Sequence, residues 1–460
     1  GGTVLLPAGD YLCHSLHLRS NVRLQLECGA TIVAADDAGK NSSASAYDAA
    51  EANPWDQYQD FGHSHWHNSL IWGEDVENVA ITGPGRIWGR GLSRGWGEGP
   101  KAEDPGVGNK SIALKNCRNV TLRDFSVLHG GHFALLATGV DNLTVDNLVI
   151  DTNRDGLDID CCRNVHISNC SVNSPWDDAI CLKSSFGLGS VRATEGVTIT
   201  NCYVTGDFEE GSLLDGTMRR FSAEAKVPRT GRIKFGTESN GGFRNITISN
   251  CVFEGCGGLA LETVDGGDLE DVTISNIAMR QVANAPIFIR LGSRMRGPKD
   301  ASIGKLRRVL ISNLVCSDTD SRLCSIASGI PDHEIEHVKF SHIYIEHRGG
   351  GTQADAALDV PENENAYPEP DMFGPMPAHG FYFRHVRGLE MDHVEIESRK
   401  GDARPAFLLE DVKSADFVRV KVPQLFSAPN FSLKNVEDFN LDLSRPIRDA
   451  HWDRVEEKKF

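Results

Sequence analysis

A parallel β-helix, an all-β fold, is what this sequence predicts, on the evidence of one short pattern that recurs along the chain. The pattern is Asn or Asp, an aliphatic residue, a polar residue, a second aliphatic residue and often Asn. It opens at Asn78, Asn119, Asn142, Asn164, Gly196, Asn245 and Asp271, with weaker copies at Arg308, His337 and Leu389. The step of 23 residues from Asn119 to Asn142 is shorter than the ~30 residues of a strand–helix–strand unit. It suits one coil of stacked strands, with Val, Ile and Leu inside and Asn at the turns.

The strands are expected from the first residues onward, interrupted by three long loops. Alternation stops and polar, Gly, Pro or acidic residues gather at 37–67, 207–230 and 348–380, which are therefore the predicted loops. Residues 426–460 are expected to cap the stack with shorter strands and a charged tail. Because a solenoid grows without dividing, residues 1–460 are expected to form a single domain. Asn-Gly hairpin signals, which a sandwich or propeller needs, are scarce.

Composition narrows the class of partner. The chain has 47 Lys and Arg against 64 Asp and Glu, a net charge of −17, so a nucleic-acid partner is not expected. No apolar run is long enough to span a membrane. Several of the 12 cysteines recur at one repeat position, as in Cys170, Cys202 and Cys251, which predicts buried thiols rather than a disulfide framework. Nothing indicates an oligomeric state.

The compartment is left open by the first residues. Gly1 already opens a strand-like pattern, so the natural start is expected to lie outside this sequence. A periplasmic or extracellular location is favoured over a cytoplasmic one.

Two acidic clusters stand one coil apart and form the candidate catalytic centre. Asp155 precedes Asp177 by 22 residues, and Asp178 follows directly. Because stacked strands lie about 4.8 Å apart, the three carboxylates are expected to share one patch, where like charges raise at least one pKa. The structural alternative is that they cap ordinary turns. Catalysis is the favoured interpretation, since three close acids are costly unless they are used.

The motifs around these acids resemble those of glycoside hydrolase family 28, the polygalacturonase and rhamnogalacturonan hydrolase family. They are NRDGLDID, which contains Asp155, and DDAICLKS, which begins at Asp177. The resemblance extends to about residue 425 by the repeat. It implies a right-handed parallel β-helix, no cofactor or metal, and inverting hydrolysis of an α-glycosidic bond in a pectic polysaccharide or oligosaccharide. By position Asp177 resembles the general acid, and Asp155 and Asp178 the base that orients water. Inversion predicts carboxyls roughly 6.5–9.5 Å apart.

The chain departs from the family pattern at two places. Where the family has Gly-His-Gly, this chain has TGRIKFGTES, with Gly231 or Arg232 near the position of the histidine. The family's Arg-Ile-Lys, which grips a galacturonate carboxylate, belongs one coil later, where this chain has Ala260 and Glu262. A divergent specificity is therefore expected, for a rhamnogalacturonan bond or by an exo-acting uronidase.

Eight further residues are candidate substrate contacts, and each has a structural alternative. They are Arg154, Lys183, Arg232, Lys234, Glu238, Glu262, His65 and His132. Arg232 and Lys234 share one face of a strand and are expected to hold a uronate or orient the acid. Alternation places Lys183 opposite Asp178 unless the strand bends. His63, His65 and His67 alternate without an acidic or Cys ligand at a useful spacing, so no metal site is expected there.

Two other functions stay open at this point. A polysaccharide lyase on the same fold would use a Lys or Arg base and Ca²⁺ held by carboxylates. A non-catalytic carbohydrate-binding solenoid would bind sugar without releasing any product.

Overall fold

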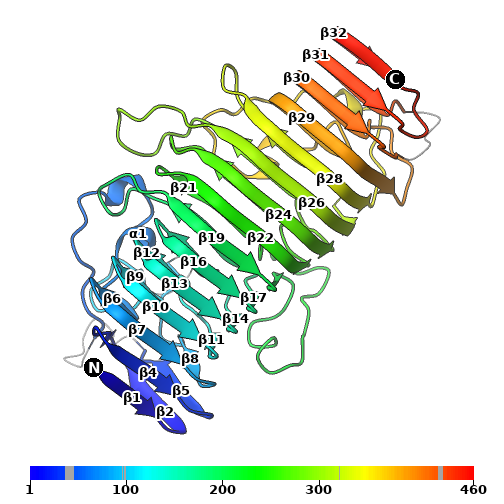
Figure 1. Cartoon of the computed structure of the whole chain (residues 1–460). Helices are drawn as coiled ribbons and strands as arrows, with labels where there is room; N and C mark the ends of the chain where they lie inside the picture. The colour runs from blue at the N-terminus through cyan, green and yellow to red at the C-terminus, as the bar shows by residue number, and fades with distance from the viewer. Residues whose placement is uncertain (37–45, 96, 98–99, 321, 423–427) are drawn as a thin grey trace. The chain divides into compact units, whose positions relative to one another are not determined.

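The computed structural model describes residues 1–36, 46–95, 97, 100–320, 322–422 and 428–460, arranged in two compact units, 1–234 and 235–460. Both units are built almost entirely of parallel strands (Figure 1). The predicted right-handed parallel β-helix is confirmed, whereas the assignment of the chain to a single domain stays a prediction. Within the described part of the chain, no helix combines the length and the apolar character that a membrane crossing requires.

Three stacks of strands make up the first unit. The first contains β1 (Gly2–Leu6), β4 (Val22–Leu26), β7 (Glu77–Thr82), β10 (Arg118–Arg123), β13 (Asp141–Asp146), β16 (Arg163–Ser168) and β19 (Thr194–Thr200). The second contains β2 (Gly9–Cys13), β5 (Ala30–Ala34), β8 (Arg86–Trp88), β11 (Ser126–Leu128), β14 (Val149–Asp151), β17 (Ser171–Asn173) and β20 (Tyr203–Thr205). The third contains β3 (Leu16–His17), β6 (Ser69–Glu74), β9 (Lys110–Lys115), β12 (Phe133–Thr138), β15 (Asp155–Asp160) and β18 (Ile180–Ser184). β21 (Ile233–Ser239) crosses the boundary between the units.

The register of the stacks reproduces the repeat in the sequence. Val120 pairs with Leu143, and Leu143 pairs with Val165, so each coil places the same pattern position above the last. These three aliphatic side chains are all at most 1% exposed. The apolar core of the unit is therefore a continuous column that runs across the strands.

A ladder of asparagines marks one turn of each coil. Asn78, Asn119, Asn142 and Asn164 all have left-handed backbone, with φ between 54° and 59°. The side-chain Nδ2 of each of the last three donates to Oδ1 of the Asn in the coil before, at 2.8–2.9 Å. Asparagine recurs here because it tolerates this backbone and can also bond to its own copy above and below.

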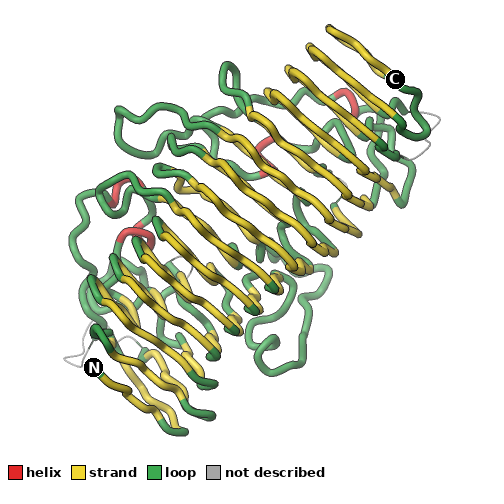
Figure 2. The backbone as a smooth tube through the Cα atoms, viewed as in Figure 1, coloured by secondary structure: helices red, strands yellow, loops and turns green. Residues whose placement is uncertain are grey.

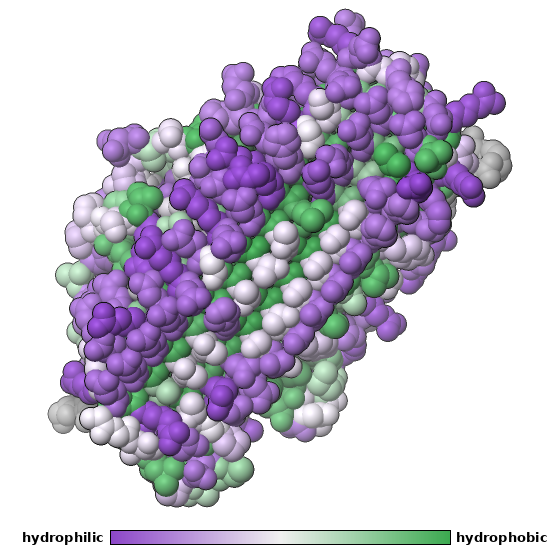
Figure 3. Space-filling model, in the orientation of Figure 1, coloured by the Kyte–Doolittle hydropathy of each residue, from purple (hydrophilic) through white to green (hydrophobic). Residues whose placement is uncertain are grey.

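Longer strands build the second unit. One stack contains β22 (Phe243–Glu254), β24 (Leu269–Arg280), β26 (Leu306–Thr319), β28 (Ile335–His347), β29 (Phe381–Ser398), β30 (Phe407–Val418), β31 (Phe431–Asp442) and the antiparallel β32 (Ala450–Lys459). The other contains β23 (Leu259–Thr263), β25 (Ile287–Leu291) and β27 (Ser325–Ser328), which pairs with the start of β29. Left-handed residues interrupt each of three strands at two or more positions: Asn245 and Asn250 in β22, Asp271 and Asn276 in β24, and Arg308, Asn313 and Asp318 in β26. Rows of white and green residues cross the visible sheet face in Figure 3. Val252 of β22 and Val315 of β26 are exposed.

The predicted loops carry the few helical turns (Figure 2). In the first loop, residues 37–45 lie outside the described part, and the rest contains η1 (Asp56–Tyr58) and α1 (Phe61–Ser64). Residues 207–230 contain no element. The loop 348–380 contains η2 (Asp355–Ala357) and η3 (Pro370–Phe373). In the predicted cap at 426–460, residues 426 and 427 are outside the described part, and β31 and β32 follow.

Buried arginines hold the loop 348–380 against the strands of its unit. Arg290 Nη2 donates to the carbonyl of Glu362 at 2.9 Å, and Arg384 donates to the carbonyls of Val360 and Pro361 at 2.8 Å. Both arginines are 1% exposed. The predicted thiols are also buried: all twelve cysteines are free, and ten of them are buried.

Candidate active site

Three aspartates meet at the start of adjacent strands in the first unit. Asp155 is the first residue of β15. Asp177 and Asp178 come just before the neighbouring strand β18, from which only Ala179 separates them. One carboxylate oxygen from each lies within 4.8 Å of the others. Asp155 and Asp178 are 3% exposed, while the side chain of Asp177 is 28% exposed. The structure thus brings together the acids whose spacing suggested one patch.

Basic side chains pair with two of these carboxylates. Arg232 Nε donates to Asp178 Oδ1 at 2.7 Å, and Lys234 Nζ lies 3.6 Å from Asp178 Oδ2. Arg154 donates to Asp177 Oδ2 from Nη2 at 2.9 Å and from Nε at 3.2 Å. Asp155 is 4.0 Å from Arg154, farther than either pair.

The surroundings push the pKa values of two of the acids apart. Burial raises the pKa of Asp155 well above its ordinary value, and the charges of Asp177 and Asp158 add to the rise. Burial alone would also raise the pKa of Asp178, but Arg232, Lys234 and Lys183 together hold it below its ordinary value. The surroundings therefore favour the protonated form of Asp155 and the ionised form of Asp178. Carboxyls held in opposite states are the arrangement that acid–base chemistry uses.

The predicted cationic pair has a more specific position than the sequence indicated. Arg232 and Lys234 were expected to face outward, where they could hold a uronate or orient the acid. Both are only 2% exposed and are directed at Asp178. Their contact is thus with the chain's own carboxylate.

Lys183 lies on the same side as the acids. Its Nζ is 3.8 Å from Asp158 Oδ2, and its charge acts on Asp155 and Asp178. The expected placement opposite Asp178 is therefore not what the structure has. The strand-start geometry changes the alternation, because Ala179 and Ile180 both donate their backbone N–H to the carbonyl of Arg232.

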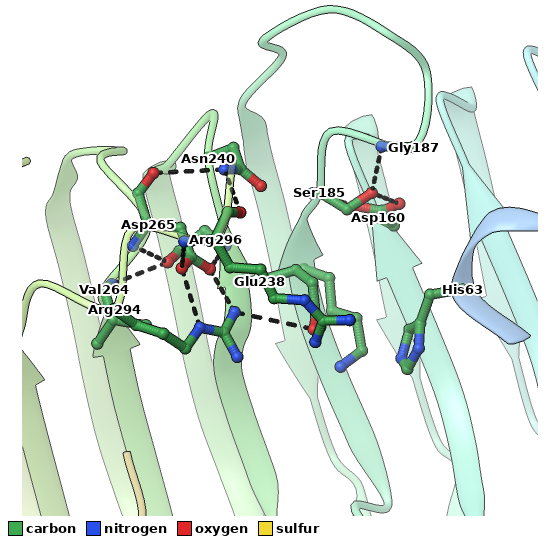
Figure 4. A network of polar contacts seen from close by, with 12 residues as sticks. His63, Asp160, Ser185, Gly187, Glu238, Asn240, Val264, Asp265, Arg294 and Arg296 are labelled. Carbon is green, nitrogen blue, oxygen red and sulfur yellow. Dashed lines mark hydrogen bonds and ion pairs between the residues drawn. The ribbon is translucent and has the colours of Figure 1, made fainter. Parts of the chain in front are cut away.

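The sequence interpretation did not single out two further acids of β15, Asp158 and Asp160. Asp158 is fully buried, 3.6 Å from His63 Nε2, and burial raises its pKa while Lys183 and His63 oppose the rise. Asp160 accepts hydrogen bonds from the N–H and Oγ of Ser185, both at 2.7 Å (Figure 4). The alternating acids of GLDID were the signal, since Asp158 and Asp160 share one face of β15.

The two histidines proposed as sugar contacts differ in their surroundings. His132 stacks on Phe133 with ring centroids 4.2 Å apart and lies edge-on to His63 at 5.8 Å. Burial lowers the pKa of His132 well below its ordinary value, and Arg154 lowers it further, so the ring is neutral. His65 stacks on Phe61 at 3.9 Å, and its Nδ1 is 2.9 Å from the Phe61 carbonyl, which is a structural role.

The two predicted glutamates belong to the second unit. Glu238 is 4% exposed and its carboxylate lies 3.9 Å from Arg294. Arg294 also bonds to Asp265, which accepts the N–H of Arg296 at 2.9 Å (Figure 4). Glu262 is fully buried. Their use as substrate contacts stays a prediction.

A tryptophan covers the sheet on the N-terminal side of the acids. Trp66 is fully buried and packs with Ala113 of β9 and with Phe133 and Leu136 of β12. Its indole Nε1 donates to Thr138 at 3.1 Å, and its backbone N–H donates to Glu51 at 3.0 Å. The segment that carries Trp66 therefore closes the outer face of β9 and β12.

The three aspartates have the spacing of a metal site, but their charges are already matched. Among the described residues, Asp155, Asp177 and Asp178 form the group with ligand geometry. Arg154 pairs with Asp177, while Arg232 and Lys234 pair with Asp178. A cation entering here would have to displace these positive groups, so the donor set does not fit a divalent metal.

Comparison with known proteins agrees with the resemblance seen in the motifs. Residues 5–207 match the family model described as Glycosyl hydrolases family 28. That part of the chain is therefore similar to family 28. It includes all three aspartates and both family 28 motifs, whereas Arg232 and Lys234 follow its end. No curated protein matches the chain.

Solved structures share the fold of the matched segment and of much of the remaining chain. An exopolygalacturonase from Thermotoga maritima has a TM-score of 0.61 and 18% identity, covering 86% of this chain and 84% of that one. A family 28 exopolygalacturonase from Yersinia enterocolitica has a TM-score of 0.62 and 17% identity, covering 91% and 72%. The surface adhesin PfbA of Streptococcus pneumoniae has a TM-score of 0.52 and 15% identity, covering 95% and 92%. At these identities the likeness is one of fold.

Proposed function

We propose that the protein is an inverting glycoside hydrolase that cleaves α-glycosidic bonds in pectic polysaccharide or oligosaccharide from a chain end. The observation that carries the proposal is the group of three aspartates, two of them held in opposite protonation states, inside a segment that is similar to family 28. Glycosidases of this kind need one carboxyl that gives a proton and another that activates water.

The roles of the acids follow from their exposure and charge. Asp178 keeps its negative charge beside Arg232 and is the base that orients water. Asp177 is the most exposed of the three, so its carboxyl reaches the leaving oxygen as the general acid. Burial raises the pKa of Asp155, so in this proposal Asp155 supplies Asp177 with its proton rather than sharing the base role that the resemblance implies.

The separation of the acids does not by itself select inversion. The chosen oxygens lie within 4.8 Å of one another, closer than the roughly 6.5–9.5 Å between carboxyls of typical inverting enzymes. The proton NMR spectrum of the first product formed decides the stereochemistry, because inversion gives the β-anomer from an α-linked substrate.

Action from a chain end is supported by the covered strands. A polymer lying across the coils would have to pass over β12 and β9 on one side of Asp155. Trp66 occupies that surface, packed on Leu136 and Ala113. This covering favours a sugar chain that approaches from the other side and ends near Trp66.

Two rival functions make different predictions. A lyase requires Ca²⁺ and a free Lys or Arg base, and it leaves an unsaturated sugar that absorbs ultraviolet light. Here Arg154, Arg232 and Lys234 are all paired with carboxylates. A non-catalytic binding solenoid would hold sugar without cleaving it. The likeness of this fold to that of the adhesin PfbA keeps this alternative open.

The test is a substrate panel with a matched variant. The protein is incubated with homogalacturonan, rhamnogalacturonan and short oligomers, and the products are identified by mass. A single released sugar is expected, and Asp177→Asn should lower the rate by about 10²–10⁴. Asp215→Asn, whose carboxylate is 48% exposed in a loop, should leave the rate unchanged. Bound but uncleaved sugar would favour the binding solenoid, an ultraviolet-absorbing product the lyase, and no product from any substrate would end the hydrolase proposal.

A further inference from the structure

The loop 207–230 reaches the acid cluster through one glutamate. Glu210 Oε2 accepts a hydrogen bond from Arg94 Nη2 at 3.1 Å, and its other oxygen lies 2.8 Å from Nδ1 of His129. The carboxylate of Glu210 is 24% exposed, the imidazole of His129 19% and the guanidinium of Arg94 37%. Arg94 Nη2 also lies 3.0 Å from His129 Nδ1, so a guanidinium and an imidazole from separate coils meet at a single loop carboxylate.

Contacts on both sides of Glu210 hold this part of the loop in place. Before it, Asn173 Nδ2 donates to the carbonyl of Phe208 at 2.9 Å. After it, the buried carboxylate of Asp151 accepts the N–H of Leu213 at 2.9 Å. The position of Glu210 is thus determined by residues of β14 and β17 rather than by the loop alone.

Arg94 continues the chain of contacts to the acids. Its backbone carbonyl accepts Nη1 of Arg154 at 2.9 Å, while the other nitrogens of Arg154 bond to Asp177. The side chain of Arg154 is only 12% exposed. Hydrogen bonds thus connect Glu210 to Arg94, Arg94 to Arg154, and Arg154 to the Asp177 carboxylate.

We propose that Glu210, Arg94 and His129 are positioning residues that fix Arg154 on Asp177, so that the loop 207–230 determines where the Asp177 carboxylate points. The proposal rests on the function given above, because it assigns the acid step to Asp177. None of the three touches the reacting atoms. Their effect passes through Arg154.

The first test measures Asp177 itself and needs no substrate. Exposed carboxylates react with a carbodiimide and glycine ethyl ester, and peptide mass spectrometry reports the rate at each residue. In Glu210→Gln the anchor of Arg94 loses its charge, Arg154 loosens, and modification of Asp177 should rise about three- to tenfold, in line with a charged hydrogen bond of moderate strength. Glu209→Gln is the matched control, since Glu209 pairs with Arg219 on the exposed side of the same loop.

A second variant and a double-mutant cycle separate positioning from simple loss of folding. His129→Gln removes the other partner of Glu210 and should raise modification of Asp177 in the same direction, with an unchanged circular dichroism spectrum. Glu210→Gln combined with Arg154→Lys should have less effect than the sum of the two, because both act on one contact. Additive effects, or an Asp177 rate in Glu210→Gln equal to that of Glu209→Gln, would overturn the proposal.

Activity provides the final readout. With the substrate identified by the panel, Glu210→Gln should lower kcat about tenfold with KM unchanged and move the pH profile, whereas a merely structural loop contact would leave the profile in place. If the wild type cleaves nothing while Asp177 modification still rises, the contact series is upheld and the hydrolase function falls.

Discussion

Replacing Arg232 with Met tests the electrostatic arrangement of the acid cluster most directly. Arg232 is 2% exposed and donates at 2.7 Å to Asp178, which is 3% exposed. Removing one partner of a buried ion pair costs about 3–5 kcal/mol, because the other charge is left without compensation. The low end of this range is expected, since Lys234 remains 3.6 Å from the same carboxylate.

The pH dependence of the loss follows from the pKa of Asp178. Burial opposes the ionisation of Asp178, but the neighbouring cations keep its folded pKa below the ordinary value. The stability that the ion pair contributes is therefore present above about pH 3.9 and is lost as the pH falls through the folded pKa. The difference between wild type and Arg232→Met should therefore be largest near neutral pH and shrink in acid. Urea unfolding followed by tryptophan fluorescence at pH 7 and at about pH 2–3, below the ordinary pKa of an aspartate, measures it.

The control is an arginine in an exposed pair. The side chains of Arg219 and Glu209 are 52% and 49% exposed, so Arg219→Met should leave the free energy of unfolding nearly unchanged. If Arg232→Met cost no more than this control, or if its cost grew as the pH fell, Arg232 would not be what keeps Asp178 charged.

Three other outcomes are expected. Trp66→Ala should cost about 3–5 kcal/mol of stability and, by opening the outer face of β9 and β12, shift the products from single sugars toward longer oligomers, as chromatography of the digest will report. Asp402→Asn should lower the free energy of unfolding by about 1–2 kcal/mol at pH 7, a figure already reduced for solvent screening. The reason is that Arg404, which is 2% exposed, keeps the pKa of Asp402 at about 2 despite burial. This contribution to stability should disappear as the pH falls from about 4 to about 2, which urea unfolding measures. Added Ca²⁺ or a chelator should leave the rate of product release within about twofold, since cations of the chain already pair with the carboxylates.

The stacking of coils could be predicted because it depends on local periodicity. The Asn positions recur at the length of one coil, and the structure places Asn119, Asn142 and Asn164 in hydrogen-bonded succession. That register fixes which residues share a column, so the meeting of Asp155 with Asp177 and Asp178 follows from counting along the chain.

The direction of individual side chains could not be predicted in the same way. Lys183 was placed opposite Asp178 by strict alternation, yet the backbone between them does not keep it, because two consecutive N–H groups bond to one carbonyl of Arg232. Glu210 and Arg94 lie 116 residues apart and join through a loop without a repeat. Contacts of that kind depend on tertiary packing, which periodicity does not encode.

The antiparallel strand β32 has a consequence for how the protein behaves at high concentration. It pairs with β31 along Ser432 to Leu441, and Phe460 stacks on Phe431 with ring centroids 5.3 Å apart. An unpaired β31 would present a row of free N–H and C=O groups beside exposed aromatic rings, which is a template for strand addition by another molecule. β32 instead turns Glu456, Glu457 and Lys458 toward solvent, so the final coil offers neighbouring copies a charged and mostly hydrated border.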